Sequence, residues 1–382
     1  MEIEGGALYM SFSQLNTIQL ALNEKFYDRQ QEIEALMTAL LAKQHLLLIG
    51  PAGTGKSALS AMLGEIFEDS HYFQHLLTPF STPEELFGAL SLKDLEQGVY
   101  KRNIQGMLPE AHFAFIDEIF KANSAILNSL LTLINERLYY NNGVPIASPL
   151  MTLIGSSNEY IEEDEGLEAL FDRFLLRYEV QYIRKQEDFV AMLKSTHPVF
   201  IPKLTLQQLQ EHQQRVSRVR IEDSMYMTLA KIRQALFDEG IRPSDRRFKQ
   251  SLSLLQARAY LQNRLHVTKD DMAILQHVLW ERVEQKARTR EIIEEISFDS
   301  VEDFIGRIQP EFDMLLLQAQ NLLILRSPQA RTQLSDLLMR GKALFLEVQT
   351  MNREVPNRSE LLHLKNDMHK RLLQMTSDVI GF

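Results

Sequence analysis

A short glycine-rich segment carries the residue types and spacing that most clearly indicate chemistry in this sequence. It matches the pattern G-x-x-x-x-G-K-[ST] and consists of Gly50, Pro51, Ala52, Gly53, Thr54, Gly55, Lys56 and Ser57. Glycines let successive backbone N–H groups point into one concavity, and a helix that follows adds positive potential at its N-terminus. The expected ligand is the phosphate chain of a nucleotide, with Lys56 at the β- and γ-phosphates, Ser57 on Mg²⁺ and Ala58 in the first helical turn.

A pair of acids follows an apolar run farther along the chain. Residues 112–117 end in Asp117, and Glu118 comes next. Strands commonly end in acids, so the pair alone is a weak signal, but after a phosphate loop it has a specific interpretation. We expect Asp117 to hold the Mg²⁺ shell and Glu118 to polarise the water that attacks the γ-phosphate.

A third apolar run ends in a side-chain amide. Residues 153–157 precede Asn158, which could orient the attacking water beside Glu118. The alternative interpretation is an asparagine in a turn or at a helix N-cap. The two motifs before it favour the functional interpretation.

These side chains need a sheet to bring them together. Short apolar runs at residues 45–49, 72–77, 112–117, 150–155 and 175–182 alternate with segments of helical periodicity. Strands that alternate with helices predict a parallel five-stranded sheet covered on both faces. We therefore expect an α/β nucleotide-binding domain over residues 1–183.

The rest of the chain has helical periodicity throughout. We expect an all-α lid domain over residues 184–285 and a helical hairpin or bundle over residues 286–382, with turns at Ser327-Pro328 and Pro356-Asn357. A further hairpin is expected at residues 139–149, centred on Asn142-Gly143.

Composition restricts the class of protein. The chain has 382 residues, 45% of them hydrophobic, which suits two or three globular domains. A formal charge of -10 counts against nucleic acid as the main partner, and the lack of cysteine excludes disulfides and thiolate zinc sites. We find no secretory signal and no run long enough to span a membrane, so a cytoplasmic location is expected.

The order of these motifs resembles that of a known family. The matching segments are the phosphate loop, Asp117-Glu118-Ile119, residues 125–131, residues 134–137, Asn158 and residues 170–174. Together they look like the MoxR family of AAA+ ATPases, in particular its RavA-like branch, over roughly residues 14–260. The resemblance implies a P-loop AAA+ core that binds ATP and Mg²⁺, followed by an all-α lid.

The resemblance also assigns arginines to the site. It implies that Arg173 is an arginine finger that reaches the γ-phosphate held by a neighbouring subunit; a surface arginine paired with Asp172 is the alternative. It places the sensor 2 arginine at Arg246, with Arg247 as the other choice.

Two further segments take their interpretation from the family. Tyr27 and Arg29 lie where the family's chain passes the adenine, although a core aromatic and a helix-capping charge explain them equally well. The segment between Thr78 and Met107 corresponds to a helix-2 insert that faces the ring axis, where a client could be gripped. A surface hairpin is the alternative.

The leading hypothesis is a ring, expected to be hexameric, that couples ATP hydrolysis to chaperone-like remodelling of a protein client. The family further suggests a partner with a von Willebrand factor A domain. The sequence lacks strands after residue 285, whereas relatives carry a β-rich module there. The rivals are a DNA-handling AAA+ loader or helicase and a nucleotide-gated scaffold with little turnover.

Overall fold

The computed structural model describes residues 2–160, 167–297, 300–325, 328–354 and 358–380. The chain forms two compact units that divide between Ser297 and Phe298. Each unit is treated separately below, and the boundaries expected after residues 183 and 285 stay predictions. Within the described residues, no helix is both long and apolar enough to cross a membrane.

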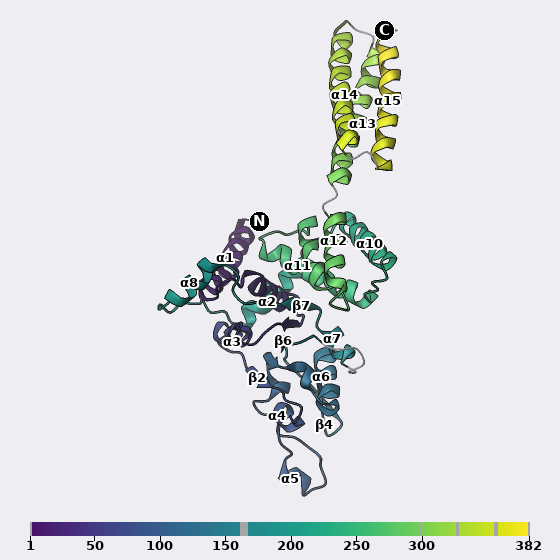
Figure 1. Ribbon diagram of the computed structural model, residues 1–382. Coiled ribbons are helices and arrows are strands. Elements are labelled where there is room, and N and C mark those ends of the chain that lie inside the picture. The colour runs from purple at the N-terminus through teal and green to yellow at the C-terminus, as the bar shows by residue number, and fades with distance from the viewer. Residues whose placement is uncertain (1, 161–166, 298–299, 326–327, 355–357, 381–382) are drawn as a thin grey trace. The chain divides into compact units, whose positions relative to one another are not determined.

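A parallel sheet forms the centre of the first unit (Figure 1). Its strands among the described residues are β1 (Leu46–Ile49), β2 (Tyr72–Leu76), β3 (Phe113–Asp117), β6 (Thr152–Ser157) and β7 (Leu176–Glu179), in the order β2-β3-β6-β1-β7. All four neighbouring pairs are parallel. The predicted five-stranded parallel sheet is confirmed.

Alternate residues of each strand face opposite sides of this sheet, as the two-residue period of a strand requires. Leu46 and Leu48 join one hydrophobic core, whereas Leu47 and Ile49 join another. Helices α2 (Gln30–Ala42) and α3 (Lys56–Ile66) cover the first face, and α6 (Ser124–Glu136) covers the second. Burial on both faces explains why these strands read as continuous apolar runs.

Helices continue the first core beyond the sheet. The N-terminal helix α1 (Glu2–Lys25) precedes α2, and α7 (Glu168–Arg173) precedes β7. After β7 come α8 (Gln186–Lys194), α9 (Leu206–Val216), α10 (Asp223–Asp238), α11 (Asp245–Leu261), the 3-10 segment η3 (Lys269–His277) and α12 (Gln285–Ser297). Gly240, with φ +76°, breaks the chain between α10 and α11. Leu254 and Ile292 share a core with Leu46, so these helices pack as part of the first unit.

A small excursion separates β2 from β3. It contains α4 (Pro83–Phe87), α5 (Leu92–Leu95) and the 3-10 turn η1 (Leu108–Glu110), while η2 (Ile119–Lys121) follows β3. The hairpin β4 (Leu138–Asn141) and β5 (Val144–Ala147) turns at Asn142 and Gly143, which have φ values of +54° and +74°. Positive φ at both positions is typical of the predicted two-residue hairpin turn.

Three helices make the described part of the second unit: α13 (Ser300–Leu325), α14 (Pro328–Glu354) and α15 (Ser359–Ile380). They lie side by side (Figure 1) around a core of their own that includes Phe312, Val348 and Met368. The predicted C-terminal helical bundle is therefore present.

Candidate nucleotide-binding site

The carboxyl ends of β1, β3 and β6 lie side by side, and the sequence motifs follow these three strands. The register pairs Ile49 of β1 with Ser157 of β6, and Ile116 of β3 with Gly155 of β6. The residues that follow these strands therefore lie at one edge of the sheet. This edge carries the phosphate loop, the two acids and Asn158.

The loop backbone needs glycine for a steric reason. A Cβ atom on Gly50 would lie 1.9 Å from the carbonyl oxygen of Val180, so no side chain fits between the loop and the end of β7. Gly53 and Gly55 have φ values of +80° and +86°, the left-handed conformation that glycine adopts at little cost. Gly55 then serves as the N-cap of α3, which directs the start of that helix at the loop.

The lysine side chain folds back over this loop. The Lys56 ammonium donates to the carbonyl oxygens of Gly50 and Pro51, the latter at 2.9 Å, and to the side-chain oxygen of Asn158 at 3.2 Å. Burial lowers the pKa of Lys56, while the charges of Asp117 and Glu118 oppose this shift. The cation is therefore held between the loop and the two acids.

Asn158 connects the lysine to the second acid. Its amide nitrogen donates to the Glu118 carboxylate, which also forms an ion pair with Lys121 at 3.4 Å. The Asp117 carboxylate accepts from the Ser156 hydroxyl and, at 3.1 Å, from the backbone N–H of Glu118. The structure thus brings together Lys56, Asn158, Asp117 and Glu118, as predicted.

Glu118 also has an uncommon backbone. Its φ is +52°, the left-handed conformation that residues with a Cβ adopt at some cost. Such strain is found most often at functional sites, where the surrounding structure maintains it. Here the conformation places the Glu118 side chain against Asn158 rather than along the direction of β3.

The oxygen ligands near the loop suit magnesium. The Ser57 hydroxyl and the Asp117 carboxylate are hard ligands, and Mg²⁺ typically takes only one or two protein ligands together with substrate phosphates and water. Among the described residues, no cluster of three histidines or acids could hold a metal by itself. The residues therefore fit an ion that arrives with a nucleotide.

A cavity of about 430 Å³ adjoins the loop. One wall consists of Lys25, Phe26, Tyr27 and Arg29, another of Gly53 to Gly55, and a third of Tyr182, Ile183, Phe189 and Met192. Tyr27 lies in this wall, as predicted. Sequence reasoning missed the side chains of α8; the signal was its amphipathic pattern, because none of its apolar residues is buried.

Arg29 also lines this cavity, and backbone carbonyl groups hold its side chain. Its guanidinium is buried and donates to the carbonyl oxygens of Thr54 at 3.0 Å, Asp28 at 2.6 Å and Gln181 at 2.7 Å. Its hydrogen bonds therefore connect the phosphate loop to the segment after β7.

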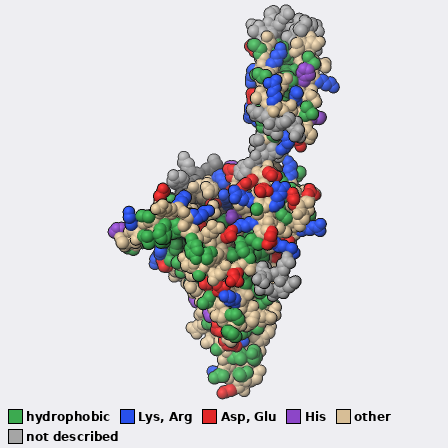
Figure 2. All heavy atoms as spheres, viewed as in Figure 1, with side chains coloured by type: hydrophobic (Ala, Val, Ile, Leu, Met, Phe, Trp, Pro, Cys, Tyr) green, Lys and Arg blue, Asp and Glu red, His purple; other side chains and the backbone are tan. Residues whose placement is uncertain are grey.

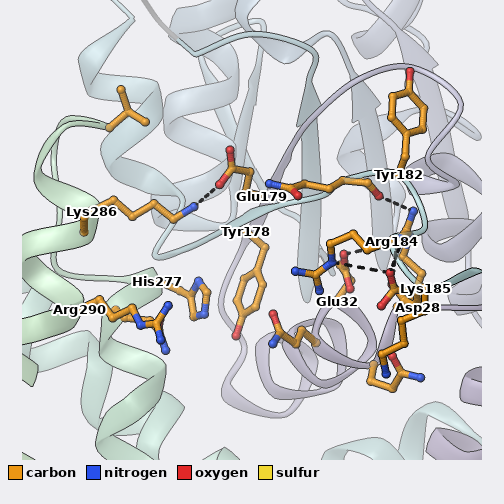
Figure 3. Close-up of a pocket in the computed structure, with 17 residues that line it drawn as sticks. Asp28, Glu32, Tyr178, Glu179, Tyr182, Arg184, Lys185, His277, Lys286 and Arg290 are labelled. Carbon is orange, nitrogen blue, oxygen red and sulfur yellow. Dashed lines mark hydrogen bonds and ion pairs between the residues drawn. The ribbon is translucent and has the colours of Figure 1, made fainter. Parts of the chain in front are cut away.

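A larger cavity, of about 740 Å³, shares Arg29 and Tyr182 with the first one and is drawn in Figure 3. Charged side chains of both signs line it, including the ion pairs Lys286 with Glu179 and Arg184 with Asp28. No residue of the loop 50–57 contributes to it. We therefore place the nucleotide site at the smaller cavity.

The arginines expected as the finger and as sensor 2 have hydrogen-bond partners outside the phosphate loop. Arg173, at the end of α7, donates to Asp172 at 3.3 Å, and its Nε has no partner among the described residues. Arg246, on α11, donates to Asn135 at 2.9 Å and is exposed. Burial lowers the pKa of Arg173, and the positive charge of Arg246 lowers it further. Arg247 is buried instead.

Comparisons with known proteins match most of the first unit to domain families. Residues 13–217 match the model of the MoxR domain in MoxR–vWA–beta-propeller ternary systems, and residues 224–293 match an AAA lid domain. Two uncharacterised proteins of Methanocaldococcus jannaschii are similar: one is 37% identical over 298 residues, 77% of each chain. The other is 39% identical over 272 residues, 70% of this chain and 71% of that protein.

One solved structure shows the same fold. It comes from Cytophaga hutchinsonii, is described as a candidate ATPase, and superposes with a TM-score of 0.63 over 78% of this chain and 97% of its own. At 19% identity, this likeness concerns the fold alone.

Proposed function

We propose that this chain, which belongs to the MoxR family of AAA+ ATPases, hydrolyses ATP in a ring whose active sites are completed by neighbouring subunits. The observation that carries the proposal is the hydrogen-bonded series Lys56, Asn158 and Glu118 at the end of the phosphate loop. A site that only bound nucleotide would not need an acid held beside the lysine by an amide. The RavA-like branch stays a prediction.

The residues take the following roles. The loop from Gly50 to Ala58 would surround the phosphates, with backbone N–H groups from every residue except Pro51. Lys56 would bind the β- and γ-phosphates, and Ser57 and Asp117 would hold Mg²⁺. Bound Mg²⁺ neutralises charge on the phosphates. Glu118 accepts the proton of the attacking water, and Asn158 orients that water.

The apolar cavity beside the loop is the proposed site of the adenine. Tyr27 and Phe189 offer aromatic side chains there, and Met192 offers a flexible apolar one. Arg29 acts by fixing the loop, since its three nitrogens bind carbonyl oxygens of three different segments.

The remaining charge on the γ-phosphate would come from the next subunit. The hydrogen-bond partners of Arg173 and Arg246 among the described residues belong to α6 and α7 rather than to their own phosphate loop. We assign Arg173 as the finger and Arg246 as the sensor, both acting in trans in a ring of six subunits. A trans arginine contributes roughly 10³ to 10⁵ in rate in other nucleotide hydrolases.

A client would meet the excursion between β2 and β3 and the neighbouring hairpin. Their exposed apolar side chains include Phe80, Leu92, Leu95, Tyr100, Tyr140 and Val144. Figure 2 shows apolar atoms at the lower tip, where Figure 1 places α5. Exposed apolar groups of this kind mark interaction sites. The matched family model occurs in systems with a von Willebrand factor A protein, so we propose such a partner in remodelling.

Phosphate release and native mass of three proteins test this proposal. We expect the wild type to form a ring and hydrolyse ATP, Glu118→Gln to bind ATP and assemble without turnover, and Arg173→Ala to bind ATP with a greatly reduced rate. Normal hydrolysis by monomeric Arg173→Ala would exclude the ring mechanism. Repeating the assay with DNA separates the rival function, since salt-sensitive stimulation by DNA would support a DNA-handling motor instead.

A further inference from the structure

The finger arginine ends a helix that needs external partners. Helix α7 has only six residues. The carbonyl groups of its last turn accept no hydrogen bond from another residue of the helix. The carbonyl oxygens of Phe171, Asp172 and Phe174 instead accept hydrogen bonds from two buried arginines. Arg173 lies in the middle of this segment.

The first of these arginines comes from the sheet. Arg177 of β7 is 1% exposed and donates to Phe174 at 3.1 Å and to Phe171 at 3.2 Å. A third nitrogen donates to the carbonyl oxygen of Trp280, at 2.5 Å. Its guanidinium also lies 3.8 Å from the centre of the Phe171 ring. One side chain thus joins α7 to the segment after η3.

The second arginine comes from the helical part. Arg247 of α11 is 2% exposed and donates to the carbonyl oxygens of Asp172 at 3.2 Å and Phe174 at 3.0 Å. It also donates to Val278, at 2.8 Å. Burial lowers the pKa of Arg247 to about 10, so it stays protonated at neutral pH.

A carboxylate links this arginine to the finger itself. One oxygen of Asp172 accepts from Arg247 Nε at 3.3 Å, and the other accepts from Arg173 at 3.3 Å. Arg247 and Arg173 both donate to the Asp172 carboxylate. A movement of Arg247 would therefore also move the Arg173 guanidinium, through this one side chain.

Packing alone does not explain two buried cations here. Apolar side chains of similar volume usually serve a protein core as well as or better than buried charges do. Arginine, by contrast, has five donors in a rigid fork and can bind several carbonyl groups at once. Each of these forks joins α7 to residues 278–280.

We propose that Arg177 and Arg247 are positioning residues that place Arg173 for its neighbour and couple that placement to residues 278–280, the turn that follows η3. The inference rests on the proposed function of Arg173 as a finger in trans. A shift of α11 or of residues 278–280 then moves the finger, so the helical part of one subunit controls hydrolysis in the next.

Arg247→Gln tests the coupling, with Arg258→Gln as its matched control. Arg258 lies on the same helix but binds Glu34 and the carbonyl oxygens of Asp270 and Asp271, without contact to α7. We expect Arg247→Gln to lower kcat about 100-fold, the effect of a misplacement near 1 Å, with an unchanged Kd for ATP. Arg258→Gln should keep the wild-type kcat.

Mixing separates a misplaced finger from a damaged fold. Glu118→Gln subunits cannot turn over but present an intact finger, so adding them to Arg247→Gln should raise the rate above that of either protein alone. A variant that was merely destabilised would gain nothing. Should Arg247→Gln fail to fold, Asp172→Asn, which removes the shared carboxylate from the surface of the same segment, is measured in its place with the same expected result.

The outcomes distinguish the two levels of the proposal. If Arg173→Ala keeps the wild-type rate, the trans finger itself is wrong. If Arg173→Ala loses its rate while Arg247→Gln and Asp172→Asn keep theirs, or if mixing fails to raise it, the coupling is wrong and the finger remains.

Discussion

Asn158 lies between a cation and an acid that would otherwise meet directly. Its oxygen accepts from Lys56 and its nitrogen donates to Glu118, so the amide has the one orientation that satisfies both. A nucleotide that bound Lys56 would therefore be sensed at Glu118 through a single side chain. This is the physical reason an amide, rather than a third charge, suits this position.

Buried histidines make stability depend on pH. Burial lowers the pKa of His45 well below its ordinary value, that of His212 to about 4 and that of His277 to about 3. Below pH 6.5 these histidines become protonated in the unfolded chain but stay neutral in the folded chain, so acidification favours unfolding. Each histidine should lower the free energy of unfolding by about 1.4 kcal/mol at pH 5.5, one unit below its pKa in the unfolded chain.

Urea unfolding at pH 7.5, 6.5 and 5.5 measures this dependence. We expect the free energy of unfolding to fall toward pH 5.5, and to fall less steeply in His212→Gln, which lacks one of the titrating groups. A free energy that stayed constant or rose on acidification would contradict the prediction.

Local pattern predicted the residues whose roles depend on the loop itself. The glycines, Lys56, Asp117 and Asn158 lie in the structure where a strand–loop–helix reading puts them. Arg29 and Arg247 could not be interpreted this way, because their surroundings are carbonyl groups far away in the sequence: Thr54 and Gln181 for one, Phe174 and Val278 for the other.

At the scale of elements, α8 is the clearest departure from an ordinary amphipathic helix. Its apolar residues are all partly or largely exposed, and Figure 2 shows apolar atoms around the place where Figure 1 labels α8. Phe189 and Met192 nevertheless line the cavity beside the loop. We therefore propose that Phe189 and Met192 cover a ligand in this cavity.

Phe189→Ala should weaken ATP binding about tenfold, because stacking of an aromatic side chain on a base contributes on the order of 1–3 kcal/mol. Leu193→Ala is the matched control, since Leu193 lies on the same helix and does not line the cavity. Titration with ATP and with inorganic tripolyphosphate should show the loss for ATP only. Equal ATP affinity in wild type and Phe189→Ala would refute the adenine assignment.

The helices and strands could be predicted from the sequence better than the neighbours against which they pack. Every strand of the sheet and the 139–149 hairpin follow from periodicity and turn residues. The strand order does not, because register comes from long-range packing of both sheet faces. For the same reason the sequence could not assign helix α12 to the first core, where Ile292 and Ile293 pack in the same cluster as Leu46 of the sheet.

At the scale of the whole chain, the second unit has a core of its own. Phe312, Leu334, Val348, Leu361 and Met368 pack among themselves, in a cluster separate from those on the two sheet faces. The described residues that line the candidate nucleotide site all belong to the first unit.

A chain that ends at Ser297 should keep the wild-type affinity for ATP and its rate of hydrolysis, because both cores of the first unit remain whole. Isothermal titration and phosphate release measure the two quantities. A truncated protein that folds but no longer binds ATP would show that the second unit contributes to the site.

The central claim is that each active site is completed by the next subunit, and complementation tests it most directly. Phosphate release is measured for Glu118→Gln, for Arg173→Ala and for mixtures of the two over a range of ratios. Each variant alone should be nearly inactive, whereas mixtures should recover activity, because an Arg173→Ala site then receives the intact finger of a Glu118→Gln neighbour. A mixture no more active than its parents would contradict the claim.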